Sequence, residues 1–219
     1  MPRLLFSKKG NAVWISHLDL MRVFQRAFKR AGLPLTHTQG FNPRPSVSIA
    51  LPLSVGISSE CELLDFDLTK EDYTCEEIKD RLNDKLIEGV EVQEVYDRGR
   101  KLRELSYLEC QVVLQYDKCL PADAAVAVSA LFQRPALIMN KKTKSGMQEM
   151  DILPMIRDLV VERINDCELK IKARICCQNP SLNPMQLAGA VTEYLPELAP
   201  ASVNCHRIEI YDNNESVFR

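Results

Sequence analysis

The sequence predicts an α+β protein made of two ferredoxin-like (split βαβ) sandwiches in tandem, each an antiparallel sheet with helices on one face. The first observation is the order of patterned segments in the first half: strand, helix, two strands, helix, strand. The second is that a similar order returns in the second half. The third is a composition of 46% apolar and 26% charged residues, which is typical of a globular chain of 219 residues. We therefore expect domains at residues 1–97 and 104–219, joined by a linker at 98–103.

The first half opens with two expected strands and a long helix. Residues 3–8 and 12–15 have the apolar content of strands, on either side of a turn. Ser16 is a good helix N-cap with Asp19 three residues later, and Gly32 is a stop signal. A helix is therefore expected between Ser16 and Gly32. The residues at helical spacing that should form its buried stripe are Leu20, Phe24, Ala27, Phe28 and Ala31.

The remaining elements follow from the same kinds of signal. Thr74 predicts the start of the second helix, and Asn183 predicts the start of the last one. The residues after Tyr211 show no pattern and are expected to be frayed. The expected strands are residues 46–51, 61–68, 90–95, 108–114, 136–139 and 202–211, with a hairpin from 159 to 176, and the expected helices are residues 75–87, 122–132 and 183–195.

Charge is distributed unevenly along the chain, although the formal net charge is only -2. Residues 1–50 hold eight basic residues against one acidic residue, a net charge of +7. Residues 51–100 hold six basic residues against fourteen acidic residues, a net charge of -8. Two interpretations stay open: the two blocks pair with each other, or the basic block forms a surface that attracts an anionic partner.

Several classes of site lack the motifs that they require. No Cys-x-x-Cys pair is present, so the eight cysteines are expected to be reduced core residues, and no metal site is expected. The eight glycines form neither a dinucleotide fingerprint nor a P-loop, and no cofactor is expected. The sequence has no run of about 18 apolar residues and no cleavable leader, which predicts a cytoplasmic protein without membrane contact.

The first helix contains most of the candidate site. His17 lies in its first turn, where free N–H groups and the helix dipole attract phosphate. Three roles stay open for His17: bonding to the neighbouring loop, anion binding, and general-base catalysis. We expect the imidazole of His37 to lie near it. The cations at helical spacing on the face opposite the apolar stripe are Arg22, Arg26, Lys29 and Arg30.

Residues 39–45 form a loop that two prolines stiffen, because each proline fixes its own φ and disfavours helix in the residue before it. Phe41 and Arg44 are its candidate binding residues, since an exposed aromatic side chain stacks on a nucleic-acid base and a cation pairs with a phosphate. The alternative for Phe41 is an inward position in the core. A second cationic patch, unless it is only a solvated hairpin tip, is expected on a turn that contains Lys141, Lys142 and Lys144.

Several short segments occur in an order that is more specific than any one of them. They are Trp14–Leu20, Arg30–Leu35, Gln39–Pro45, Ala50–Gly56, Glu62–Asp65, Lys142–Gly146 with Met150–Ile152, and His206–Arg207. This combination resembles the radical-SAM-associated bacterial domain-of-unknown-function family, whose members stand alone or are fused C-terminal to a B12-binding-type radical SAM protein. The resemblance implies partnership with a radical SAM enzyme and supplies no reaction. Since the chain lacks a Cys-x-x-x-Cys-x-x-Cys cluster motif, it is not the radical SAM enzyme itself.

Three functional hypotheses follow. The first is a non-catalytic RNA-binding accessory subunit that works with a separate radical SAM enzyme and presents tRNA or rRNA through the basic helix and the loop. The second is a metal-independent endoribonuclease with His17 as general base, by analogy between tandem ferredoxin-like folds and RNA-processing nucleases. The third is a protein-only scaffold that docks the radical SAM enzyme.

Overall fold

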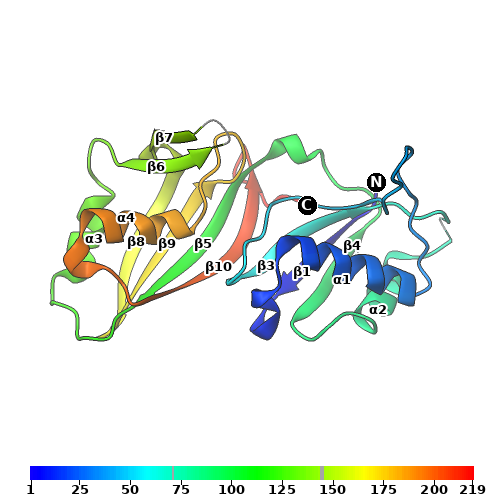
Figure 1. Ribbon diagram of the computed structural model, residues 1–219, viewed down its shortest axis with the longest axis horizontal. Coiled ribbons are helices and arrows are strands. Elements are labelled where there is room, and N and C mark those ends of the chain that lie inside the picture. The colour runs from blue at the N-terminus through cyan, green and yellow to red at the C-terminus, as the bar shows by residue number, and fades with distance from the viewer. Residues whose placement is uncertain (71, 144–145) are drawn as a thin grey trace. The chain divides into compact units, whose positions relative to one another are not determined.

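The chain forms two compact units, Met1–Glu104 with Val217–Arg219, and Leu105–Ser216 (Figure 1). The computed structural model describes residues 1–70, 72–143 and 146–219, and for residues 141–143 the backbone alone. Among the described residues, no helix has both the length and the apolar character needed to cross a bilayer.

The first unit is an antiparallel sheet on which two helices pack. Its elements in chain order are β1 (Arg3–Lys8), α1 (His17–Arg30), β2 (Val47–Ile49), β3 (Ile57–Phe66), α2 (Cys75–Asn83) and β4 (Val90–Tyr96). β1 pairs with β3 and with β4, and β2 pairs with β3, which gives the strand order β4-β1-β3-β2. The element order is that of a split βαβ unit.

The second unit has a similar element order around an inserted hairpin. Its elements are β5 (Leu105–Gln115), α3 (Ala124–Leu131), β6 (Ile138–Thr143), β7 (Gly146–Asp151), β8 (Ile156–Asn165), β9 (Glu168–Cys176), α4 (Met185–Tyr194) and β10 (Ser202–Asp212). β6 and β7 form a separate two-stranded sheet, and the other four strands pair antiparallel in the order β10-β5-β9-β8. α3 packs on β8, and α4 packs on β5 and β10. The predicted α+β class with antiparallel sheets is confirmed.

Aromatic packing attaches α1 to the sheet of the first unit. The ring of Phe24 lies edge-on to Phe6 of β1, with 4.7 Å between the ring centroids. The ring of Phe28 lies 5.1 Å from that of Phe66 in β3. All four side chains are fully buried, so the predicted buried stripe of the helix is confirmed at its centre.

The predicted ends of α1 are also confirmed. Ser16 caps the helix by accepting a hydrogen bond from the Asp19 N–H at 3.2 Å. Gly32 follows the helix with a φ of +69°, a conformation that glycine adopts without steric cost.

Residues predicted as a strand at 12–15 instead belong largely to a 3-10 helix, Gly10–Trp14. The Nζ of Lys8, whose side chain is fully buried, donates to the carbonyls of Val13 at 3.1 Å and Ile15 at 2.9 Å. A buried ammonium group is costly without such acceptors. The strand prediction is wrong because this contact outweighs the strand propensity of the apolar residues.

The residues expected to be frayed after Tyr211 end in a buried anchor. Phe218 is fully buried in the first unit, and the guanidinium carbons of Arg3 and Arg100 lie 5.5 and 5.0 Å from its ring centre. A Cβ added to Gly99 would lie 2.4 Å from Cζ of Arg3, so a side chain there would collide with this cluster. The segment 98–103, expected as a linker, therefore packs as part of the first unit.

The cysteines are only partly core residues. Cys61, Cys110 and Cys205 are buried, Cys119 is exposed, and the other four are half-buried. All eight are free thiols. Burial raises the pKa of Cys205 to about 12 and also raises the pKa of Cys110. The prediction of a core position is wrong for Cys119 because it lies in the loop between β5 and α3.

Replacing Phe24 by Ala is expected to lower the free energy of unfolding by about 3–5 kcal/mol, because a fully buried ring is lost and a cavity remains beneath α1. The control is Leu18→Ala on the same helix, which removes a side chain that is 69% exposed. Its expected effect is within about 0.5 kcal/mol. Urea denaturation followed by circular dichroism measures both. Equal losses in the two variants would contradict the assignment of the buried face.

Iodoacetamide is expected to alkylate Cys119 first in the native protein, because it is the exposed thiol. Cys110 and Cys205 should react only after unfolding, since burial both blocks the reagent and disfavours the thiolate. Mass spectrometry of tryptic peptides over time gives the order of modification. Modification of Cys110 at the rate of Cys119 in the folded protein would be inconsistent with the structure.

Candidate functional site

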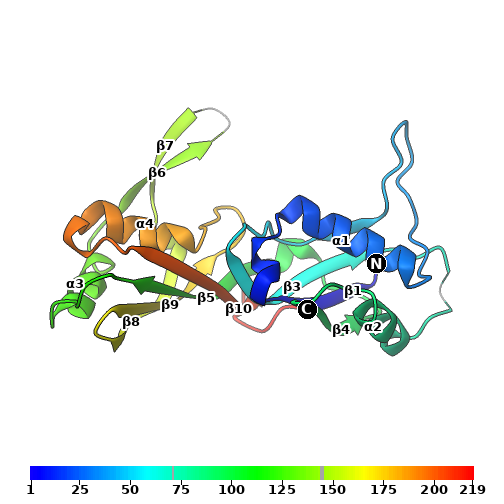
Figure 2. The same cartoon turned by 60° about the horizontal axis from the view of Figure 1, so that its bottom comes forward.

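Residues 36–46 form a hydrogen-bonded arm that projects from the first unit, visible as the light blue loop in Figure 2. The Thr38 N–H donates to the carbonyl of Arg44 at 2.9 Å, and the Arg44 N–H donates to the Thr38 hydroxyl at 3.0 Å. Nearer the base, the Ser46 N–H donates to the Thr36 carbonyl at 2.8 Å. We call this segment the arm.

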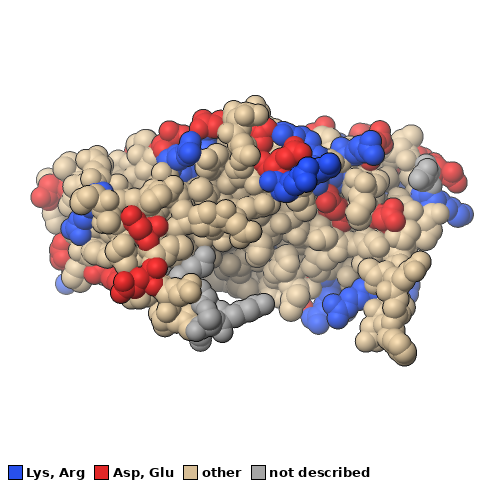
Figure 3. Space-filling model, turned by 90° about the horizontal axis from the view of Figure 1, so that it is seen from above, with Lys and Arg blue, Asp and Glu red and all other residues tan. Residues whose placement is uncertain are grey.

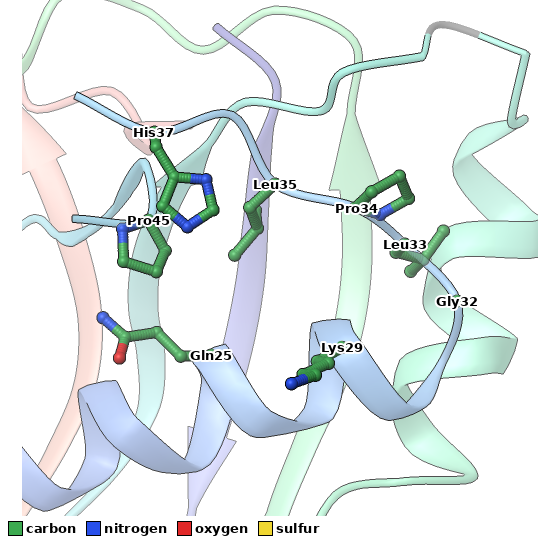
Figure 4. Close-up of a pocket in the computed structure, with 8 residues that line it drawn as sticks. All are labelled: Gln25, Lys29, Gly32, Leu33, Pro34, Leu35, His37 and Pro45. Carbon is green, nitrogen blue, oxygen red and sulfur yellow. The ribbon is translucent and has the colours of Figure 1, made fainter. Parts of the chain in front are cut away.

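An open groove lies between α1 and the arm. It consists of two pockets of about 460 and 800 Å³, which share Gln25 and Pro45 in their walls. Figure 4 shows the smaller pocket, with Gln25 and Lys29 on α1 on one side and Leu35, His37 and Pro45 on the other. We call the two pockets together the α1 groove. The wall residues that bear on binding are Leu18, Met21, Arg22, Gln25 and Lys29 from α1, and His37, Thr38, Arg44 and Pro45 from the arm.

The helical wall of the groove is one stripe of α1. Four of its residues follow one another at spacings of four, three and four positions, which places them on one side of the helix. They are Leu18, Arg22, Gln25 and Lys29. Arg26 and Arg30 are exposed but line neither pocket. The four predicted helix cations are therefore divided, with Arg22 and Lys29 in the groove and the other two flanking it.

These cations differ in their ionic partners. Arg22 pairs with Asp19, with 2.6 Å between Nη1 and Oδ1. Hydrogen bonds from the Ser16 hydroxyl and from Arg22 lower the pKa of Asp19, so this carboxylate stays charged beside Arg22. Around the groove, the exposed cations for which no described carboxylate forms an ion pair are Arg26, Lys29, Arg30 and Arg44. Exposed cations elsewhere, such as Lys101, Arg103 and Lys118, also lack an ion pair with a described carboxylate.

The acidic block of the sequence neutralises only part of the basic block. Asp65 pairs with Arg3 at 2.6 Å, and Glu60 pairs with Lys9 at 2.7 Å. Neither pair involves α1 or the arm. The pairing interpretation therefore holds for Arg3 and Lys9, whereas the cations of α1 and the arm do not pair with this acidic block.

Phe41 lies at the tip of the arm and is fully exposed, at 105% of its reference area. The inward position considered for it is wrong, because the hydrogen bonds of the arm hold its tip away from the core. Arg44 is exposed and forms part of the groove wall. The arm thus presents an aromatic ring and a cation on one short segment.

The two histidines predicted to lie near each other are not brought into one pocket. His37 lines the pocket that contains Lys29, whereas His17 lines neither pocket. Positions 17 and 29 are about 18 Å apart along the axis of α1. The Nδ1 atom of His17 is buried and has no hydrogen-bond partner among the described residues. Among all the residues that the structure describes, no group of three or more His, Cys, Asp or Glu side chains is arranged to hold a metal ion.

The second predicted cationic patch lies on the β6–β7 hairpin of the second unit. Lys141 and Lys142 are strand residues rather than turn residues, because the pairing of β6 with β7 continues to Thr143. Lys144 lies outside the described residues.

On the sheet of the second unit, by contrast, cations have carboxylate partners. Lys172 pairs with Glu109 at 2.7 Å, and Arg174 pairs with Glu215 at 2.9 Å. The guanidinium of Arg174 also lies over the ring of Tyr211, at 4.4 Å. Burial and the hydrogen bond to Glu109 raise the pKa of Tyr211 to about 12. Figure 3 shows acidic side chains beside basic ones along the upper edge of the view.

Two exposed apolar side chains, one at the start of α1 and one just before it, are not among the predicted site residues. Trp14 is 70% exposed and ends the 3-10 helix just before the N-cap of α1. Leu18 is 69% exposed and lines the groove. A Cβ added to Gly56 would lie 3.7 Å from the Trp14 ring, so the ring rests beside this stretch of backbone. One sequence feature could have identified Trp14 as a site residue: it is a tryptophan that lies directly before an amphipathic helix and outside the apolar stripe of that helix.

Comparison with solved structures finds proteins of similar fold. The crystal structure of a Cbf5-Nop10-Gar1 complex contains a chain that matches with a TM-score of 0.55 at 7% identity, over 95% of this chain and 48% of that one. The crystal structure of the archaeal box H/ACA sRNP Nop10-Cbf5 complex matches with a TM-score of 0.48 at 6% identity, over 94% and 46%. This chain therefore spans about half the length of those chains. At 7% identity, the first likeness concerns the fold alone.

Comparison of the sequence with curated proteins finds no match. One family, described as "Uncharacterized protein conserved in bacteria (DUF2344)", matches residues 2–184. The match includes residues 2–104 of the first unit, and this range contains α1 and the arm. The chain therefore belongs to this uncharacterised bacterial family, DUF2344.

Proposed function

We propose that this protein binds RNA through the α1 groove, as a non-catalytic accessory subunit that works with a separate radical SAM enzyme. The observation that carries the RNA proposal is the set of exposed cations around the groove for which no described carboxylate forms an ion pair. These residues are Arg26, Lys29, Arg30 and Arg44.

Phosphate groups are the natural partners of such a set. Each Lys or Arg that neutralises a phosphate releases counterions, which favours binding without any sequence-specific contact. Arginine also offers a planar fork of donors that fits phosphate oxygens. Because the whole chain carries a formal charge of -2, the attraction must act locally, within a Debye length of about 8 Å at physiological ionic strength.

The radical SAM partnership rests on the resemblance carried by the sequence. Three of the segments that carry it, Trp14–Leu20, Arg30–Leu35 and Gln39–Pro45, contribute residues to the walls of the α1 groove. The resemblance and the cations therefore meet on one surface. This supports a subunit that presents an RNA, with tRNA and rRNA as the candidate classes, to an enzyme that supplies the chemistry.

Removing cations in and beside the groove is expected to weaken RNA binding and its salt dependence. The variant combines Arg26→Ala, Lys29→Ala and Arg44→Ala. For a single-stranded RNA, the slope of log affinity against log salt should fall by about 2, since each lost phosphate contact removes about 0.7. Fluorescence anisotropy of a labelled RNA at several salt concentrations measures this slope.

The matched control removes three exposed cations outside the groove, with Lys101→Ala, Arg103→Ala and Lys118→Ala. It carries the same change in net charge and should leave the slope close to that of the wild type. Equal slopes for the groove variant and the control would show that binding is not localised at the groove, and would remove the proposal.

The partnership is tested by co-expression with the radical SAM enzyme of the same genome. We expect the two proteins to purify together after nuclease treatment, because an accessory subunit contacts its enzyme directly. The groove-neutralised variant should retain the enzyme while losing RNA. Failure of the two wild-type proteins to associate, with or without RNA, would contradict the accessory role.

A further inference from the structure

We infer that the nucleic acid held by the α1 groove is single-stranded, and that Trp14 and Phe41 are the two platforms on which its bases stack. This inference rests on the proposed function and adds the class of RNA and two binding residues. It follows from two exposed aromatic rings on the segments that supply the two walls of the groove, Trp14 just before α1 and Phe41 in the arm.

The exposure of these two rings sets them apart from other aromatic side chains of the same unit. Trp14 is 70% exposed and Phe41 is fully exposed. The aromatic rings that are completely buried in the first unit are Phe6, Phe24, Phe28, Phe66 and Phe218. The fold therefore buries most of its large rings and leaves two of them in solvent.

Both rings are mounted on backbone that is held in place locally. Trp14 ends a 3-10 helix whose following carbonyl, that of Ile15, accepts from the buried amine of Lys8. Its ring rests beside Gly56, whose N–H donates to the carbonyl of Val13 at 2.8 Å. Phe41 is carried by the arm, where Thr38 and Arg44 exchange hydrogen bonds. A platform fixed in this way loses little conformational entropy when a base stacks on it.

Each ring is close in sequence to residues that line the groove. Trp14 precedes α1, and the exposed Leu18 and then Arg22 continue from it along the groove wall. On the opposite wall, Arg44 lies three residues after Phe41. A strand bound along the groove would therefore have an aromatic ring close in sequence to each wall, together with the cations Arg22 and Arg44 of those walls.

This arrangement favours single-stranded over double-stranded RNA. In a duplex the base faces are stacked within the helix, and only phosphates and groove edges are accessible. Unpaired bases present their faces to aromatic side chains, and each such stacking contact strengthens binding whatever the base. A duplex could use the cations of the groove but neither ring.

The sequence contains a single tryptophan, so the intrinsic tryptophan fluorescence of the protein reports on Trp14 alone. The probes are an oligouridylate and an RNA duplex, each about 12 nucleotides long. We expect the oligouridylate to quench this fluorescence as it saturates the protein, and the duplex to leave it nearly unchanged. Quenching by the duplex to the same extent would overturn the inference.

Variants supply the second measurement. Trp14→Ala and Phe41→Ala should each weaken oligouridylate binding by about 5- to 150-fold, with little change for the duplex. Trp14→Phe keeps a ring and should retain most of the affinity, which separates loss of stacking from loss of folding. Val126→Ala, at a side chain that is also 70% exposed, is the control and should have no effect.

The outcomes separate this inference from the proposed function. If both RNA forms bind with the salt dependence of the groove but without quenching or loss in the variants, the inference fails and the RNA-binding proposal stands. If neither form binds, the proposed function fails, and the inference fails with it. If both variants keep RNA affinity but release the radical SAM enzyme, the rings dock a protein and the inference is wrong.

Discussion

The packing of Phe24 and Phe28 on Phe6 and Phe66 determines where the candidate site lies. A helix turns about 100° per residue, so a fixed buried face fixes the direction of every other side chain on that helix. With these rings against the sheet, the stripe that ends at Lys29 faces the arm. The cationic surface is thus positioned by hydrophobic burial, and its charges contribute recognition rather than stability.

The parts of the fold that the sequence predicted well carry local signals at both ends. α1 begins after a capping Ser16 and ends before Gly32, and both signals act within a few residues. The errors occur where a specific side-chain contact decides the structure. Residues 10–14 fold around the buried amine of Lys8, and Phe218 is held by two arginines that lie far from it in the sequence. Strand and helix propensities do not contain that information.

The candidate site was predictable to a similar degree. Helical spacing is a local property, so the cationic face of α1 was found from the sequence. Which of those cations line a groove depends on where the arm lies. Helical spacing alone does not predict that Lys29 lines the groove and that Arg26 does not. The exposure of Phe41 depends on cross-arm hydrogen bonds, and that of Trp14 on the 3-10 helix that replaces an expected strand. The sequence left both positions open for Phe41 and did not single out Trp14, because helix and strand patterns do not predict these contacts.

The position of Phe218 ties maturation of the first unit to late translation. Residues up to Glu104 emerge from the ribosome well before this ring, because the whole of Leu105–Ser216 lies between them in the sequence. During that interval the guanidinium groups of Arg3 and Arg100 lack the ring against which they pack. The nascent N-terminal unit therefore lacks this packing contact until the C-terminal unit has been synthesised.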